Sequence, residues 1–164
     1  SISYTKEVKK EIIFLPEDDA WTEIDGFLDY WFAGEKRWSE TEKKVGNRSL
    51  FVLGGTIPPY FYYFGAYHST TLDLTKYDKV HLWFKNDYED GQLSIVFDDG
   101  SLLYDVICYL GEYKKENGWQ EYEISLNKCS WSERKPELEI IIDFKSKSGY
   151  SGGYIDGLYL CSGC

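Results

Sequence analysis

Apolar and polar side chains alternate with a period of two in several short stretches of this chain of 164 residues. A β-strand sends alternate side chains to opposite faces, so this pattern predicts strands with one buried face. The core-facing sets expected from it are Val80, Leu82 and Phe84; Leu93, Ile95 and Phe97; Tyr104, Val106, Cys108 and Leu110; and Leu138, Ile140, Ile142 and Phe144.

Turn-forming residues separate these stretches, at 89–91, 98–100, 116–118 and 148–153. Many short strands with turn signals about every 8 to 12 residues are typical of an antiparallel β-sandwich or jelly roll. The segment 35–45 is long enough for a helix but has little apolar content, so we expect a turn or irregular strand there. The length fits one domain, residues 1–164, with 161–164 as a tail or the start of a linker.

The net charge of −10 and the pI near 4.7 disfavour two classes of partner. Nucleic acid and anionic membranes both attract basic surfaces, so neither is expected. No apolar run approaches the roughly 18 residues of a membrane-spanning helix, and we expect a mature or excised soluble fragment without a signal peptide. The 15 lysines, the absence of methionine and the presence of only two glutamines favour a thermophilic origin.

The four cysteines are Cys108, Cys129, Cys161 and Cys164. They allow three pairings if all are oxidised, and the sequence does not choose among them. The alternative is two buried thiols plus a terminal pair. A zinc site is not expected, because Cys161 and Cys164 lack a second pair of ligands at matching spacing.

Catalytic motifs are missing from the sequence. It contains no Gly-x-Ser-x-Gly elbow, no His-Glu-x-x-His and no phosphate-binding loop. His68 and His81 lie in or beside predicted strands, where an exposed histidine is more often a polar surface residue than a base. A glycosidase needs two carboxylates across a cleft, and Asp105 and Asp143 are the pair to consider. Solvated strand acids explain them more simply, so we do not expect an enzyme.

Four segments in sequence order resemble the jelly-roll carbohydrate-binding modules that are appended to glycoside hydrolases. They are GNRSLFV (46–52), LDLTKYDKVHLWFK (72–85), GWQEYEISL (118–126) and YIDGLYL (154–160). The resemblance runs from about residue 13 to residue 160. It implies an extracellular, non-catalytic domain that holds a polysaccharide of the β-glucan or xylan type for an attached catalytic domain. Two alternatives remain: a structural or adhesive domain of an extracellular protein, and a jelly-roll glycosidase.

Six of the twelve residues 57–68 are aromatic, which supplies rings to both faces of a strand. A sugar ring packs its C–H face on an aromatic ring while its hydroxyls pair with polar side chains, so a sugar groove interleaves both types. The positions out of phase with the core provide this mixture. We therefore expect one sheet face to carry Tyr60, Tyr62, His81, Trp83, Lys85, Asp105 and Tyr109, with Trp31 and Trp38 as walls. Core packing, or a second buried sheet face, is the alternative for each aromatic residue.

Asp156 lies between apolar residues in the predicted last strand. An unpaired buried carboxylate costs several kcal/mol, so it needs a cation or several hydrogen-bond donors. The family resemblance implies a structural calcium here. Related modules offer an acidic residue directly after an early phenylalanine, but Leu15 follows Phe14, so the candidate substitutes are Glu17, Asp18 and Asp19. The alternative is an acidic turn without metal.

Overall fold

The computed structural model describes residues 9–14, 35–55, 64–88, 90–98, 106–130, 136–146 and 150–164. These segments contain β-strands and three short 3-10 helices but no α-helix, which confirms the all-β prediction. The strands are β1 (Lys9–Phe14), β2 (Glu35–Ser39), β3 (Ser49–Gly55), β4 (Phe64–Asp73), β5 (Lys79–Asn86), β6 (Gly91–Asp98), β7 (Val106–Tyr113), β8 (Trp119–Ser125), β9 (Pro136–Ser146) and β10 (Tyr150–Ser162). The 3-10 helices are η2 (Leu74–Lys76), η3 (Lys115–Asn117) and η4 (Leu126–Lys128).

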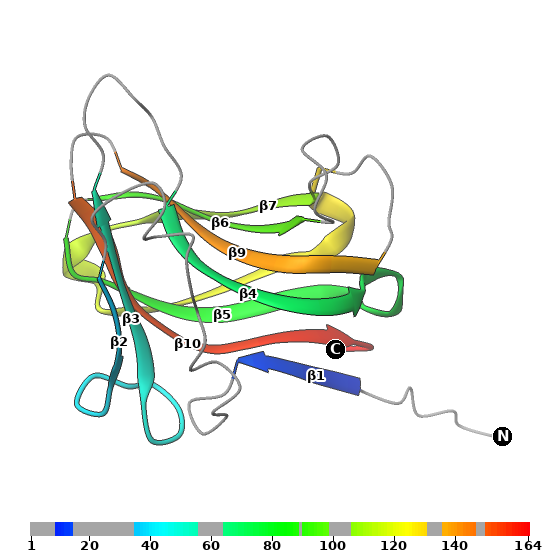
Figure 1. The fold of residues 1–164 in the computed structure, drawn as a ribbon, viewed down its shortest axis with the longest axis horizontal. Coiled ribbons are helices and arrows are strands. Elements are labelled where there is room, and N and C mark those ends of the chain that lie inside the picture. The colour runs from blue at the N-terminus through cyan, green and yellow to red at the C-terminus, as the bar shows by residue number, and fades with distance from the viewer. Residues whose placement is uncertain are drawn as a thin grey trace, which may run out of the picture.

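The strands form two antiparallel sheets (Figure 1). The sheet that we name sheet A has the order β2-β3-β10-β5-β8, with β1 also paired to β10. The other, sheet B, has the order β4-β9-β6-β7. Neighbouring strands in each sheet are often far apart in sequence, as in β3-β10-β5, so long-range pairing builds the fold.

The core lies between the two sheets and contains the predicted apolar sets of β5 and β6, together with Cys108 of β7. Tyr104, and the side chains of Val106 and of residues 138–144, lie outside what the structure describes, so their places in the core stay predictions. Val80, Leu82 and Phe84 of β5 are buried, and they belong to the same hydrophobic cluster as the buried side chains of β6 and β10. Burying an aliphatic or aromatic side chain of this size contributes about 1.5 to 3 kcal/mol. The period-two pattern therefore identified the core-facing side of these strands correctly.

Short local turns follow several of the strands. After β4, the Oδ1 atom of Asp73 accepts hydrogen bonds from Thr75 N (3.1 Å) and Thr75 Oγ1 (2.5 Å), which lower the pKa of the Asp73 carboxyl. After η3, Gly118 has a φ of 64°, in the left-handed region that glycine favours. The segment 35–45 is β2 followed by bends, as expected.

Two expectations about the C-terminal region are wrong. Residues 148–153 were expected to form a turn, but β10 begins at Tyr150 and includes Gly152 and Gly153. A Cβ atom at Gly153 would lie 2.0 Å from the Lys85 carbonyl oxygen, so this glycine permits close strand approach. Residues 161–164 are not a tail, because β10 continues to Ser162 and Gly163 N donates to Asp78 Oδ2 (2.7 Å).

The cysteines form two disulfides, Cys108–Cys129 and Cys161–Cys164. The alternative of two buried thiols is therefore wrong. In the described part of the chain, no group of three or more His, Cys, Asp or Glu side chains is placed to hold a metal ion. No helix among the described residues is long and apolar enough to cross a membrane.

Candidate functional site

Each sheet turns one face to the core and one outward, and the predicted site residues divide between the two outer faces. His81, Trp83 and Lys85 alternate with the core residues of β5, so they belong to the outer face of sheet A. Tyr109 alternates with the buried Cys108 on β7, so it belongs to the outer face of sheet B. The expectation that these four residues share one sheet face is therefore wrong, because their strands belong to different sheets.

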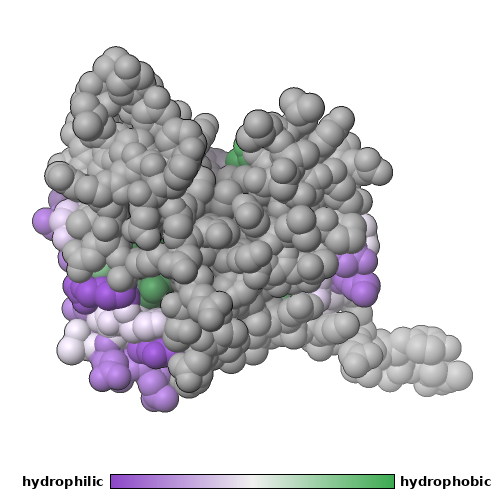
Figure 2. Space-filling model, viewed as in Figure 1, coloured by the Kyte–Doolittle hydropathy of each residue, from purple (hydrophilic) through white to green (hydrophobic). Residues whose placement is uncertain are grey.

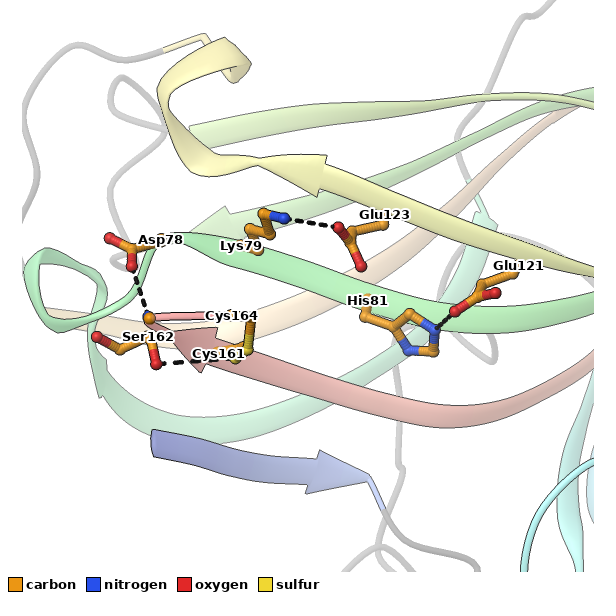
Figure 3. Close-up of polar contacts among 9 residues, drawn as sticks. Asp78, Lys79, His81, Glu121, Glu123, Cys161, Ser162 and Cys164 are labelled. Carbon is orange, nitrogen blue, oxygen red and sulfur yellow. Dashed lines mark hydrogen bonds and ion pairs between the residues drawn. A yellow bond between two sulfur atoms is a disulfide. The ribbon is translucent and has the colours of Figure 1, made fainter. Parts of the chain in front are cut away.

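His81 is almost fully buried, with an exposed fraction of 3%. Its Nε2 atom lies 2.7 Å from Glu121 Oε1 (Figure 3). Its Nδ1 atom lies 3.0 Å from the Gly157 carbonyl oxygen. The ring stacks on Tyr159 with centroids 4.4 Å apart and an interplanar angle of 17°. Burial and the nearby Glu123 carboxylate raise the pKa of Tyr159. The expectation of an exposed surface histidine is wrong, because both ring nitrogens have partners within the protein.

Trp83 and Lys85 contact the connection between β2 and β3, which we name the β2–β3 connection (residues 40–48). Lys44 Nζ lies 4.4 Å from the centroid of the Trp83 ring. Lys85 Nζ lies 2.8 Å from Glu42 Oε2. In Figure 2 the described surface around this connection, at the lower left, is hydrophilic. The chain itself therefore supplies partners to two residues that were expected to contact sugar.

Trp38 packs partly buried against the hydrophobic core. It pairs with the buried Leu50 across β2 and β3, so its position is in phase with the core rather than with Trp83. The guanidinium carbon of Arg48 lies 3.9 Å from the centroid of a Trp38 ring. Trp38 is thus held between the core and an arginine.

An aromatic cluster that the sequence analysis missed lies on the outer face of sheet A. Phe51 and Tyr154 are both buried, with ring centroids 5.0 Å apart. Trp119 approaches Tyr154 at 6.4 Å, Tyr88 approaches Phe51 at 6.3 Å, and Arg37 lies 4.3 Å above the Phe51 ring. The cluster draws on strands distant in sequence, and its only local signal is the continuous apolar run 50–53. This part of sheet A has two buried faces.

Asp156 is completely buried and its carboxylate accepts three backbone hydrogen bonds. Lys44 N (2.8 Å) and Val45 N (2.9 Å) donate to Oδ2, and Gly157 N (2.9 Å) donates to Oδ1. The requirement for several donors is thus met by N–H groups of the β2–β3 connection and of β10. The buried carboxylate therefore has hydrogen-bond donors within the chain, and a calcium-binding role for Asp156 stays a prediction. Glu17, Asp18 and Asp19 lie outside the described residues, and a calcium site there stays a prediction.

The outer face of sheet B presents large apolar side chains to solvent. Tyr109 and Ile107 of β7 are 47% and 44% exposed. Antiparallel pairing places residues of neighbouring strands opposite one another, in rows that cross the sheet. The row of Tyr109 continues through Ser94, Asp143 and Gly65. The row of Ile107 continues through Val96, Ile141 and Tyr67. The face therefore combines an exposed aromatic ring with polar positions in the same row.

Four of the predicted site residues lie outside the described residues: Trp31, Tyr60, Tyr62 and Asp105. Their roles stay predictions. Asp143 lies in β9, opposite Ser94 in β6, and the separation of its carboxyl group from that of Asp105 is not described. The glycosidase pair therefore stays a prediction as well.

Comparisons with known proteins identify the fold. No protein-family model matches the chain, and no curated protein matches it. A solved family 11 carbohydrate-binding module from Clostridium thermocellum, in complex with a β-1,3-1,4-mixed-linked tetrasaccharide, is 13% identical with a TM-score of 0.61, covering 94% of this chain and 96% of that chain. The family 11 module of a cellulosomal cellulase of Clostridium thermocellum is 14% identical with a TM-score of 0.57, covering 94% and 95%. The chain therefore has the β-sandwich fold of carbohydrate-binding modules, which the resemblance in sequence predicted.

Proposed function

We propose that this domain binds carbohydrate without catalysis and that the outer face of sheet B holds the ligand. The observation that carries the proposal is the half-exposed Tyr109 ring, in one row with Ser94 and Asp143. Stacking a sugar on such a ring hides on the order of 100 Å² of apolar surface, which at about 25 cal/mol per Å² contributes roughly 2 to 3 kcal/mol. Neighbouring polar groups then select the arrangement of hydroxyls that the site accepts, because an unpaired buried polar group costs about 1 to 3 kcal/mol.

The outer face of sheet A is less suited to a ligand. His81 is buried and bonded at both nitrogens, Trp83 lies under Lys44, and Lys85 is paired with Glu42. A sugar chain on this face would have to displace the β2–β3 connection and break these contacts. We therefore assign structural roles to these three residues, which the sequence analysis had placed in the binding site.

The ligand class that we propose is a neutral polysaccharide of the β-glucan or xylan type. A protein with a net charge of −10 repels acidic glycans more than neutral ones. The family 11 module with the same fold is seen with a mixed-linked β-glucan tetrasaccharide, which supports the β-glucan choice. Association and side-chain ordering oppose the stacking energy, so we expect a Kd around micromolar to millimolar.

The domain is proposed to be extracellular and to target a catalytic domain of a longer chain to its substrate. The two disulfides support an oxidising location. The shared fold with a module of a cellulosomal cellulase supports the attachment.

The test compares two exposed tyrosines on opposite outer faces. Tyr109→Ala should weaken binding to a mixed-linked β-glucan tetrasaccharide by about tenfold or more, since one stacking platform is lost. Tyr88→Ala removes a ring that is 37% exposed beside the aromatic cluster of sheet A. This variant should change the affinity for the tetrasaccharide less than about twofold. Isothermal titration calorimetry measures both, with xylohexaose as the second ligand.

Three outcomes contradict this assignment. Weaker binding only in Tyr88→Ala would place the site on sheet A, and no binding by the unsubstituted domain to any glycan would favour a structural or adhesive role. A release of reducing sugar by the unsubstituted domain would indicate a glycosidase.

A further inference from the structure

Strand β7, which carries Ile107 and Tyr109, is the last strand of sheet B and, among the strands that the structure describes, pairs only with β6. An edge strand has one row of backbone groups without a partner in the sheet, so its position is less constrained than that of a central strand. An aromatic ring that binds ligand on such a strand needs another source of rigidity, because a mobile ring loses conformational entropy when the ligand binds.

The segment after η4 supplies that rigidity at the residues in question. Cys108, between Ile107 and Tyr109, is buried and disulfide-bonded to Cys129. The next residue, Ser130, donates its N–H to the Ile107 carbonyl (2.9 Å), and its Oγ accepts from Ile107 N (3.3 Å). We name Cys108, Cys129 and Ser130 the β7 clamp.

The other end of the clamp is anchored in the sandwich. Cys129 N donates to the Leu126 carbonyl (3.2 Å), and the Leu126 side chain is completely buried. Leu126 N in turn donates to the Asp78 carbonyl (2.7 Å), next to the start of β5 in sheet A. The edge strand of sheet B is thus tied through η4 to the core and to the opposite sheet.

We propose that the β7 clamp positions Ile107 and Tyr109 for the ligand, in addition to any contribution to stability. This inference rests on the proposed function. Its physical basis is preorganisation: a ring that is already held in its binding orientation loses less conformational entropy when the sugar packs on it. Ser130 and the two cysteines are positioning residues, since they act through Ile107 and Tyr109.

The second disulfide provides a matched control. Cys161–Cys164 lies at the end of β10 in sheet A, beside Asp78 (Figure 3), and has no member on β7. Removing it also deletes two sulfur atoms and one cross-link, but it leaves the β7 clamp intact. A loss of affinity that follows only from removal of Cys108–Cys129 therefore reports positioning rather than a general loss of disulfides.

The experiment measures calorimetric affinity for the mixed-linked tetrasaccharide at a temperature where circular dichroism shows each variant folded. Cys108→Ala/Cys129→Ala should weaken binding about fivefold, and Cys161→Ala/Cys164→Ala less than about twofold. Ser130→Ala should weaken it about two- to threefold, and Ser130→Thr, which keeps the hydroxyl, should restore most of the loss. Amide hydrogen exchange at Ile107 and Tyr109 should accelerate in the variants that lose affinity.

Each outcome supports or overturns the proposal. If Cys108→Ala/Cys129→Ala does not fold, Ser130→Ala and Ser130→Thr carry the test. Unchanged affinity in the clamp variants, with Tyr109→Ala still impaired, overturns the clamp and leaves the proposed function in place. Equal losses in the two disulfide variants also overturn it. If Tyr109→Ala does not change the affinity, the proposed binding site on sheet B is wrong, and the proposed role of the β7 clamp is wrong with it.

Discussion

Both outer faces of the sandwich carry aromatic side chains, but the surroundings of these side chains differ. On sheet A, the rings of Phe51 and Tyr154 are buried and His81 is bonded at both nitrogens. On sheet B, Tyr109 and Ile107 remain nearly half exposed. Aromatic content alone therefore does not mark a binding face. Within the described segments, the faces differ in whether other residues of the chain cover the rings.

The partner on sheet A comes from β2 and the β2–β3 connection. Three cations from this region lie over aromatic rings: Arg37 over Phe51, Lys44 over Trp83 and Arg48 over Trp38. Each contact of this kind contributes about 0.5 to 2 kcal/mol, depending on exposure. The Asp156 carboxylate holds the same connection by two of its backbone N–H groups. The contacts of Arg37, Lys44 and Asp156 thus cover part of the outer face of sheet A, whereas Arg48 contacts Trp38, which is in phase with the core.

The largest expected effect follows from breaking the attachment of the β2–β3 connection. Asp156→Ala leaves three backbone N–H groups without their acceptor, and we expect a loss of about 3 kcal/mol in the free energy of unfolding. Urea unfolding measures it. Asp156→Asn, which keeps one oxygen acceptor, is the control and should lose less.

Calcium provides a separate check on Asp156. If its carboxylate is satisfied by N–H groups, adding a chelator should leave the melting temperature of the unsubstituted domain unchanged. A fall in melting temperature on chelation that is lost in Asp156→Asn would show instead that this carboxylate binds a cation.

A smaller effect is expected from Trp83, and it is an effect on stability alone. Trp83→Ala removes a partly exposed ring and its contact with Lys44, so we expect a loss of about 2 kcal/mol in unfolding free energy. Affinity for the tetrasaccharide should stay within about twofold, in contrast to Tyr109→Ala. If Trp83→Ala instead weakens binding tenfold at unchanged stability, the ligand binds on sheet A.

The smallest effect concerns a tyrosine that joins the two sheets. The hydroxyl of Tyr122 of β8 has two acceptors, the Gln120 side-chain oxygen (2.6 Å) and the Glu112 carbonyl of β7 (3.0 Å), and burial raises the pKa of Tyr122 to about 12. The folded state therefore keeps this proton when the unfolded state has lost it, so the stabilisation is complete below about pH 10 and falls as pH rises through 12.

The measurement compares unfolding free energies of the unsubstituted domain and Tyr122→Phe between pH 9 and pH 12. The difference between the two proteins should shrink by about 1 kcal/mol across that range, after allowance for partial exposure. A difference that is constant with pH would show that the hydroxyl does not titrate differently in the folded and unfolded states.

The strands and the core follow from local sequence. Leu93, Ile95 and Phe97 recur at every second position of β6, and all three are completely buried. Burial of one face imposes a period of two on any strand whatever its partner, so this information is present in each short segment. The resemblance of four segments to carbohydrate-binding modules likewise predicted the fold that the solved structures share.

The tertiary structure alone decided which outward residues share a face and which are covered. His81 and Tyr109 have the same phase in their own strands, but long-range pairing places β5 in sheet A and β7 in sheet B. Asp156 accepts hydrogen bonds from two donors 111 and 112 positions away, and the Cys108–Cys129 disulfide joins β7 to the residue after η4. The local periodicity of a strand predicts which side chains point away from the core. The surroundings of those side chains depend on contacts between segments that are distant in the chain.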